Sequence, residues 1–145
     1  MLLPVHRAAI RLHLLSLSAD DRHARFGHAM SDAALMLWCD HAMDGGRLWW
    51  GAWAPHEGGL CAALQLCPVG HDGTWELGLT VAHPVRRRGL GTALLGHALR
   101  HLPQVRQVVC HHGHPAIVHM ARRLGLTVHA RGDAPGIRLL THTPC

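Results

Sequence analysis

The sequence predicts a single α+β domain, and three observations lead to this prediction. The chain has 145 residues, 48% of them hydrophobic and 16% charged, which is enough apolar material for one core and excludes a disordered protein. Apolar residues recur at helical spacing in the first third of the chain and then in short runs typical of strands. Because no linker or internal repeat separates these parts, residues 1–145 are expected to fold together.

Three helices are expected in the first third of the chain, at residues 4–17, 18–26 and 31–43. Pro4 is acceptable in the first turn of the first helix, where the backbone N–H has no partner. Ser18 and Ser31 carry the hydroxyl group that favours a helix N-terminus, and acidic residues follow Ser18, where the helix dipole stabilises negative charge. The glycine pair after residue 44 ends the helical part.

Three strands follow, at residues 47–54, 60–69 and 74–81, separated by turns at 55–59 and 71–74. The third strand alternates between an apolar face, with Trp75, Leu77, Leu79 and Val81, and a small polar face, with Glu76, Gly78 and Thr80. The polar face is therefore a candidate to line a groove. The remaining elements are a helix at 89–102, a strand at 105–112, a helix at 115–125, and closing strands at 126–131 and 136–143.

The composition excludes several mechanisms. All 14 basic residues are Arg, and the chain has neither Lys nor Tyr, so it has no lysine nucleophile, lysine Schiff base or tyrosine acid. The five Cys are odd in number, have no Cys-x-x-Cys spacing and lie in apolar surroundings, so we expect reduced thiols in a cytoplasmic protein. No apolar run has the length of a signal peptide or a membrane span, so no membrane contact is expected.

The most informative segment is a strand, a basic loop, glycines and a helix, ELGLTVAHPVRRRGLGTALL. Gly89 and Gly91 let the backbone approach a ligand without a Cβ in the way. The helix start leaves free N–H groups and a partial positive charge, and three arginines at 86–88 add charge beside it. These features predict a cradle for a pyrophosphate. A Walker loop needs Lys, and the glycine spacing does not match the dinucleotide fingerprint GxGxxG.

Four ordered segments resemble the GNAT-type N-acetyltransferases. The run Arg86-Arg87-Arg88-Gly89-Leu90-Gly91 is similar to motif A of that family, R-x-x-G-x-G. ELGLTVAHP is similar to its fourth strand, VVCHHGHPAIVHMARRLGL to its fifth strand and fourth helix, and LSLSADDRHARFGHAMSDAAL to the first helices of a bacterial subgroup related to protein-lysine acetyltransferase domains. The resemblance implies a GNAT fold, a mixed central β-sheet flanked by helices in which strands four and five splay apart.

The resemblance also implies an activity and its residues. An acetyl or short acyl group would pass from acetyl-CoA, the co-substrate, to a primary amine of a small molecule or a protein lysine, by direct attack in a ternary complex. Glu76 matches the acid that many members carry on strand four, and it is expected as the base because an ammonium of pKa about 10 must lose a proton before it attacks. The implied cofactor-binding residues are Leu79, Thr80 and Val81 for the pantetheine arm, and Arg86, Arg87, Arg88, Gly89, Leu90, Gly91, Thr92 and His114 for the rest of the molecule.

Two positions depart from the family pattern. Ala121 stands where many members have a Tyr general acid, which leaves water, Cys110 or a nearby His to protonate the leaving thiolate. His114 stands where an Asn often caps the fourth helix. The missing Tyr leaves open a second interpretation, a non-catalytic acyl-CoA-binding or regulatory module on the same fold. Gly78 is expected to form a bulge that opens the splay.

The histidine clusters are interpreted without a metal. The run at 111–114 and the pair His97 and His101 have neither Cys-x-x-Cys nor HExxH spacing to support them, so no metal site is expected. His111 or His112, at the end of a strand, is kept as a candidate proton relay.

Two further features concern partners. The arginine run at 86–88 stands alone without interleaved aromatic residues, so no nucleic-acid partner is expected. Trp49, Trp50 and Trp53 are assigned mostly to the core, with a homodimer face or a wall of the amine site as alternatives.

Overall fold

The computed structural model describes residues 1–56, 58–111, 115–130 and 138–142. The helices are η1 (Pro4–His6), α1 (Arg7–Leu15), α2 (Ala19–Phe26), α3 (Asp32–Asp40), η2 (His83–Val85), α4 (Leu90–His101) and α5 (Pro115–Arg123). The strands are β1 (Leu48–Trp53), β2 (Leu60–Val69), β3 (Thr74–Val81), β4 (Gln107–Cys110), β5 (Leu126–Ala130) and β6 (Arg138–His142). Each expected helix and strand has its counterpart, although α3 ends three residues early, in a turn.

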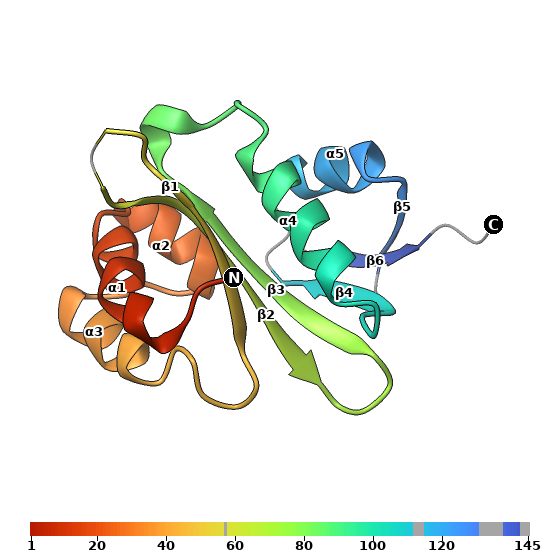
Figure 1. The fold of residues 1–145 in the computed structure, drawn as a ribbon, viewed down its shortest axis with the longest axis horizontal. Helices are drawn as coiled ribbons and strands as arrows, with labels where there is room; N and C mark the ends of the chain where they lie inside the picture. The colour runs from red at the N-terminus through yellow and green to blue at the C-terminus, as the bar shows by residue number, and fades with distance from the viewer. Residues whose placement is uncertain (57, 112–114, 131–137, 143–145) are drawn as a thin grey trace.

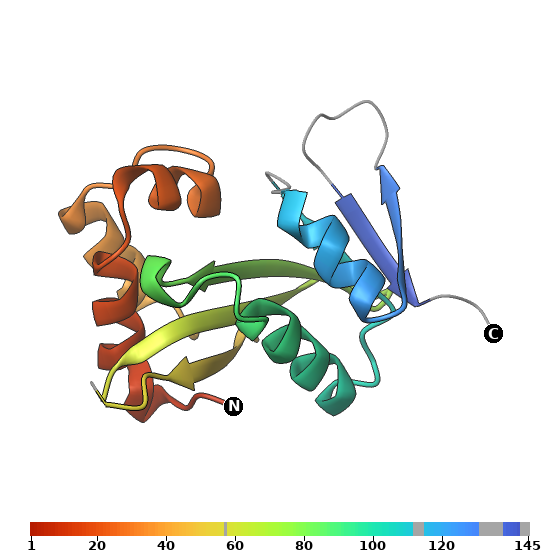
Figure 2. The same ribbon diagram turned by 90° about the horizontal axis from the view of Figure 1, so that it is seen from above.

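The six strands form one mixed sheet in the order β1-β2-β3-β4-β6-β5 (Figure 1). β3 and β4 pair in parallel, and the other neighbours are antiparallel. Helices α1 to α3 gather at one end of the molecule, α4 packs against β1, β2 and β3, and α5 packs against β5 (Figures 1 and 2). The first strand of the implied fold is reduced to a single bridge between Leu2 and Trp49, so its strands four and five are β3 and β4.

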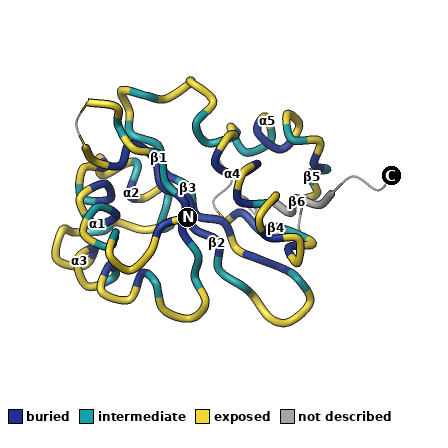
Figure 3. The backbone as a smooth tube through the Cα atoms, in the orientation of Figure 1, coloured by how far each residue is buried: buried dark blue, intermediate teal, exposed yellow. Residues whose placement is uncertain are grey.

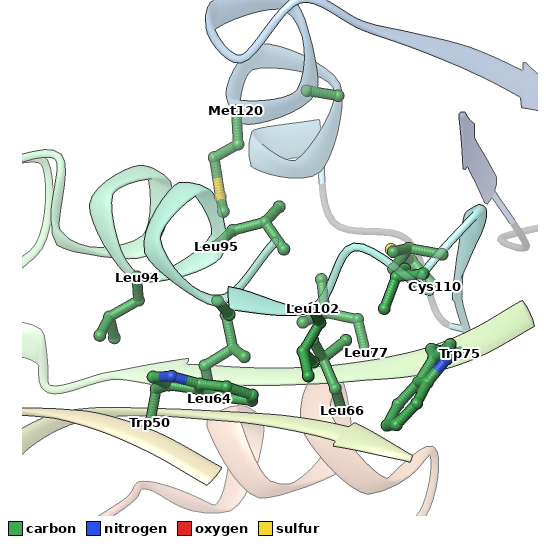
Figure 4. Close-up of a cluster of buried hydrophobic side chains, with 14 of the residues drawn as sticks. Trp50, Leu64, Leu66, Trp75, Leu77, Leu94, Leu95, Leu102, Cys110 and Met120 are labelled. Carbon is green, nitrogen blue, oxygen red and sulfur yellow. The ribbon is translucent and has the colours of Figure 1, made fainter. Parts of the chain in front are cut away.

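Strand alternation divides the interior into two cores. Trp50 and Leu64 belong to the core under α4 (Figure 4), whereas Trp49 faces α1 and α3 and donates its indole N–H to the Ala42 carbonyl over 2.7 Å. β2 lies between the cores and is buried over most of its length (Figure 3). Trp53 departs from the expected core position, since its strand ends at the sheet edge and leaves it 47% exposed.

The serine caps form as expected. Ser18 accepts a hydrogen bond from the Asp21 amide, and Ser31 accepts one from the Ala34 amide, each over 3.1 Å. Each bond satisfies one of the N–H groups that a helix start leaves free. None of the helices in the described part of the chain has the length and apolar character needed to cross a bilayer.

The expected splay lies between β3 and β4. Their parallel pairing runs from Thr74–Gln107 to Glu76–Val109 and extends no further among the described residues, although β3 continues to Val81. The expected bulge at Gly78 is wrong, because the pairing of β3 with β2 continues through this residue without a shift. Gly78 instead makes room for a side chain of α2, since a Cβ here would overlap the Arg25 guanidinium.

A buried arginine holds the three N-terminal helices together. Arg22, 8% exposed, donates hydrogen bonds to the carbonyls of Leu15, Leu17 and Met30 over 2.7 to 3.2 Å, and it pairs with Asp32 over 2.7 Å. These partners belong to the end of α1, the loop after α2, and α3. One fork of donors therefore satisfies three carbonyls, two at or just after the end of α1 and one in the loop after α2.

Replacing this arginine with a side chain of similar length tests its role. We expect Arg22→Met to lower the free energy of unfolding by about 3 kcal/mol, because three carbonyls, all at least partly buried, and a carboxylate lose their partner. Urea denaturation measures the change, with Arg123→Met on the exposed end of α5 as the control. A loss no larger than that of the control would contradict the assignment.

Candidate active site

The splay leaves one edge of β3 open. Backbone groups of a strand point alternately to its two neighbours, and the Ala82 N–H donates to a β2 carbonyl over 2.8 Å. By this alternation Leu79 and Val81 direct their N–H and C=O groups to the open edge, whereas those of Thr80 point to β2. The Leu77 N–H faces Val109 in the last parallel pair, so only its carbonyl lies at the open edge. Of the three residues expected along a pantetheine arm, Leu79 and Val81 therefore face the gap, and Thr80 does not.

The arginine loop is anchored to the end of β3 and to helix α2. Arg86 donates from Nε to the Val81 carbonyl over 2.9 Å and from Nη2 to the Asp21 carboxylate over 2.6 Å. Although burial acts to raise the pKa of Asp21, the hydrogen bond and charge of Arg86 hold it below its usual value. The Arg86 guanidinium is thus occupied by the protein, while Arg87 and Arg88 are exposed and carry the free charge of the loop.

The start of α4 has the geometry expected of an anion site. Gly89 is the N-cap with φ +77°, and the first helical hydrogen bond runs from the Ala93 amide to its carbonyl over 3.0 Å. The amides of Leu90, Gly91 and Thr92 precede that bond and have no partner within the helix. A Cβ on Gly91 would lie 3.0 Å from a Leu79 methyl group, so its absence lets the helix start sit against β3.

Glu76 is the last residue of β3 that pairs with β4, and its side chain lines a cavity. Its side chain is 47% exposed, and Oε2 lies 3.5 Å from Nε2 of His111, which is 41% exposed at the end of β4. The cavity measures about 520 Å³ and lies on the polar face of β3. The strands thus bring the expected base and the expected relay histidine together.

Several residues that line the cavity were not expected from the sequence. They come from α2, α3, β2, the loop between α2 and α3, and the residue before β1, and they are Arg25, Phe26, His28, Met30, Ala34, Trp38, Arg47, Gln65 and Cys67. Phe26 and Trp38 form the aromatic wall that was considered for the tryptophans of β1, and their rings are 5.1 Å apart, edge to face. The one available signal was Arg25-Phe26 within the LSLSADDRHARF segment.

The positions considered for a general acid differ in whether they can donate a proton to the leaving thiolate. Ala121, where a Tyr was missing, is fully buried in the core. Burial raises the pKa of the Cys110 thiol to about 12, so it holds its proton more tightly than an ordinary thiol of pKa about 8.5 and is a poor donor to a thiolate. His111 remains as a side-chain candidate beside water. His112 and His114 lie outside the described residues.

No three His, Cys, Asp or Glu side chains gather as metal ligands in the described ranges. His101 Nδ1 lies 2.8 Å from the His97 carbonyl, so this pair is bonded within its own helix.

A buried histidine contacts the polar face of β3. His13 in α1 is 3% exposed, and its Nε2 lies 2.8 Å from the Thr80 hydroxyl. Burial lowers the pKa of His13. The folded chain therefore binds this proton less readily than the unfolded chain does, so stability is full above the ordinary histidine pKa of about 6.5 and falls as the pH drops below it.

Replacing His13 tests this pH dependence. We expect wild-type stability to fall between pH 7 and pH 5 by up to about 1.4 kcal/mol per pH unit, and His13→Gln to flatten that fall while keeping a donor for Thr80. Urea denaturation at each pH measures the slope, and His56→Gln on an exposed turn is the control. Equal slopes in the three proteins would contradict the assignment.

A single family model matches most of the chain. The model of the acetyltransferase (GNAT) family matches residues 11–126, which include the open edge of β3, the arginine loop, the start of α4 and the cavity. Among curated proteins, none matches the sequence.

Several solved structures have a similar fold. The GNAT domain of S. lividans PAT superposes with a TM-score of 0.70 at 18% identity, over 96% of this chain and 85% of that one. A phosphinothricin acetyltransferase from Sinorhizobium meliloti in complex with AcCoA gives 0.66 at 16% identity, over 91% and 82%. PaiA N-acetyltransferase from Thermoplasma acidophilum in complex with coenzyme A gives 0.63 at 12% identity, over 97% and 96%. At such identities the likeness establishes the GNAT fold.

Proposed function

Because the chain belongs to the GNAT acetyltransferase family, whose members use acetyl-CoA as co-substrate, we propose that it transfers an acetyl or short acyl group to a primary amine. The amine attacks directly in a ternary complex of protein, acetyl-CoA and acceptor. The observation that carries this proposal is the open edge of β3, which lies between an anion site at the start of α4 and the Glu76 cavity.

Acetyl-CoA is proposed to bind along the gap between β3 and β4. The Leu77 carbonyl, the Val81 N–H and the backbone of Leu79 supply groups for the amides of the pantetheine arm, and the N–H of Leu79 is the candidate to polarise the thioester carbonyl. The amides of residues 87–92 and the exposed Arg87 and Arg88 hold the pyrophosphate. Arg86 acts differently from the expectation, since it positions the loop rather than the ligand.

Glu76 is proposed to take the proton from the acceptor amine. Its carboxylate opens into the cavity at the vertex of the splay, where an acceptor meets the gap. His111, 3.5 Å away, is the second member of a pair that passes the proton to solvent. When bound, acetyl-CoA supplies the thioester carbonyl that the amine attacks, and a thiolate is a good enough leaving group for water or His111 to complete its protonation.

The whole chain, residues 1–145, is proposed to act as one domain in a reducing compartment, the cytoplasm. The described cysteines are all free, which supports this location. A homodimer, a nucleic-acid partner and membrane contact are not part of the proposal.

The first experiment measures cofactor binding by isothermal titration with acetyl-CoA. We expect Gly89→Trp to weaken binding by at least about tenfold, because the indole occupies the open space at the helix N-terminus where the partial charge lies. Gly70→Trp is the matched control, since Gly70 also has a positive φ and open space but lies in the turn between β2 and β3. Equal affinities in both variants would exclude this binding site.

The second experiment follows thiol release with a panel of amines. We expect Glu76→Gln to lower kcat by about 100-fold or more and to alter its pH dependence, while the acetyl-CoA dissociation constant stays nearly the same. Asp40→Asn, at the exposed end of α3, controls for the loss of a carboxylate. An unchanged rate profile would make Glu76 a structural residue, and wild-type binding without turnover on any amine would favour a non-catalytic acyl-CoA-binding module.

A further inference from the structure

The cavity beside Glu76 has an excess of positive charge. Arg25 and Arg47 line it, and Glu76 is the one carboxylate among the described lining residues. Neither guanidinium forms an ion pair with a carboxylate in the part of the chain that the structure describes, whereas Glu76 lies beside His111. A site for a simple cationic amine would carry the opposite balance, because each fixed positive charge repels an ammonium.

Arg25 is held in a fixed position at the wall of this cavity. Its Nη2 donates to the Gln65 side-chain carbonyl over 2.5 Å, and its guanidinium lies 4.8 Å from the Phe26 ring centre and 5.6 Å from that of Trp38. Gly78 leaves the space that the Arg25 guanidinium occupies, since any Cβ there would overlap it. The side chain therefore loses little further conformational entropy when it binds a ligand.

The guanidinium keeps donors for a ligand. It carries five N–H donors in a planar fork, and one hydrogen bond, to Gln65, joins it to the described residues. Burial lowers the pKa of Arg25 to about 10, so the group remains charged at neutral pH in surroundings that strengthen an ion pair. A carboxylate matches such a fork with two parallel hydrogen bonds.

The position of Arg25 fixes where an anion would lie relative to the amine. The guanidinium lies over Gly78, and Glu76 is two residues away on the same face of β3, a separation of roughly 7 Å along the strand. An acceptor that reaches both groups spans only a few bonds. A cavity of about 520 Å³ has the size of a small-molecule site.

We propose that the acceptor is a small amino acid-like zwitterion, which presents its primary amine to Glu76 and its carboxylate to Arg25. This inference rests on the proposed function and names the substrate class of the same site. Arg47 adds long-range attraction for the negative end of the molecule, and the rings of Phe26 and Trp38 contact its apolar part.

Matched pairs of acceptors test the proposal. Thiol release from acetyl-CoA is measured with L-α-amino acids and with ω-amino acids of three to six carbons, each beside its own carboxamide, which keeps the amine and removes the negative charge. We expect the best amino acid to exceed its carboxamide in kcat/KM by at least about tenfold, the value of one charge-assisted hydrogen bond. In Arg25→Gln this ratio should fall toward one through a higher KM for the amino acid.

Two variants make the test specific. Arg100→Gln removes the same charge from the exposed end of α4 and should keep the wild-type ratio. Arg47→Gln should lower the ratio by a smaller factor than Arg25→Gln, and it serves if Arg25→Gln fails to fold. Equal turnover of acids and carboxamides by the wild-type protein, a ratio that survives Arg25→Gln, or a preference for lysine peptides would overturn the inference alone. No thiol release with any amine would overturn the proposed function as well.

Discussion

The architecture of the site depends on the point at which β3 and β4 stop pairing. Parallel strands lose their mutual hydrogen bonds after Glu76 and Val109, and the backbone groups beyond must find other partners. Part of that need is met within the chain, because the Val81 carbonyl accepts a hydrogen bond from Arg86. The remaining backbone N–H and C=O groups on this edge of β3 have no neighbouring strand to pair with. They can therefore bond to a ligand that itself carries amides.

Glu76, the last residue of β3 that pairs with β4, is held in a well-defined position. Glu76 lies on backbone that is fixed by β2 on one side and β4 on the other, so its position is better defined than that of a loop residue. Its side chain nevertheless emerges where the sheet opens. The same vertex brings in His111 from the end of β4, so the proposed base and the proposed second proton acceptor come from two strands rather than from one local motif.

Helix α2 connects the two halves of the site. Asp21 in its first turn binds the arginine loop through Arg86, Arg22 ties it to α1 and α3, and Arg25 in its last turn reaches the cavity. Three neighbouring polar residues on one short helix thus have three separate tasks. A shift of α2 would therefore alter the arginine loop and the cavity beside Glu76 together.

The sequence alone determined the order of helices and strands, and it predicted the cofactor segment and Glu76 that the proposed function uses. Periodicity, serine caps and turn glycines act locally, and Gly89 followed by a helix is a local anion site that needs no distant partner. Strand alternation likewise put Glu76, Gly78 and Thr80 on one face. Only the tertiary structure decided that Gly78 makes room for Arg25 and that Arg86 pairs with Asp21. It also decided that Phe26 and Trp38 line the cavity. These contacts join residues far apart in the chain, and their partners depend on how α2 and α3 pack on the sheet rather than on any local pattern.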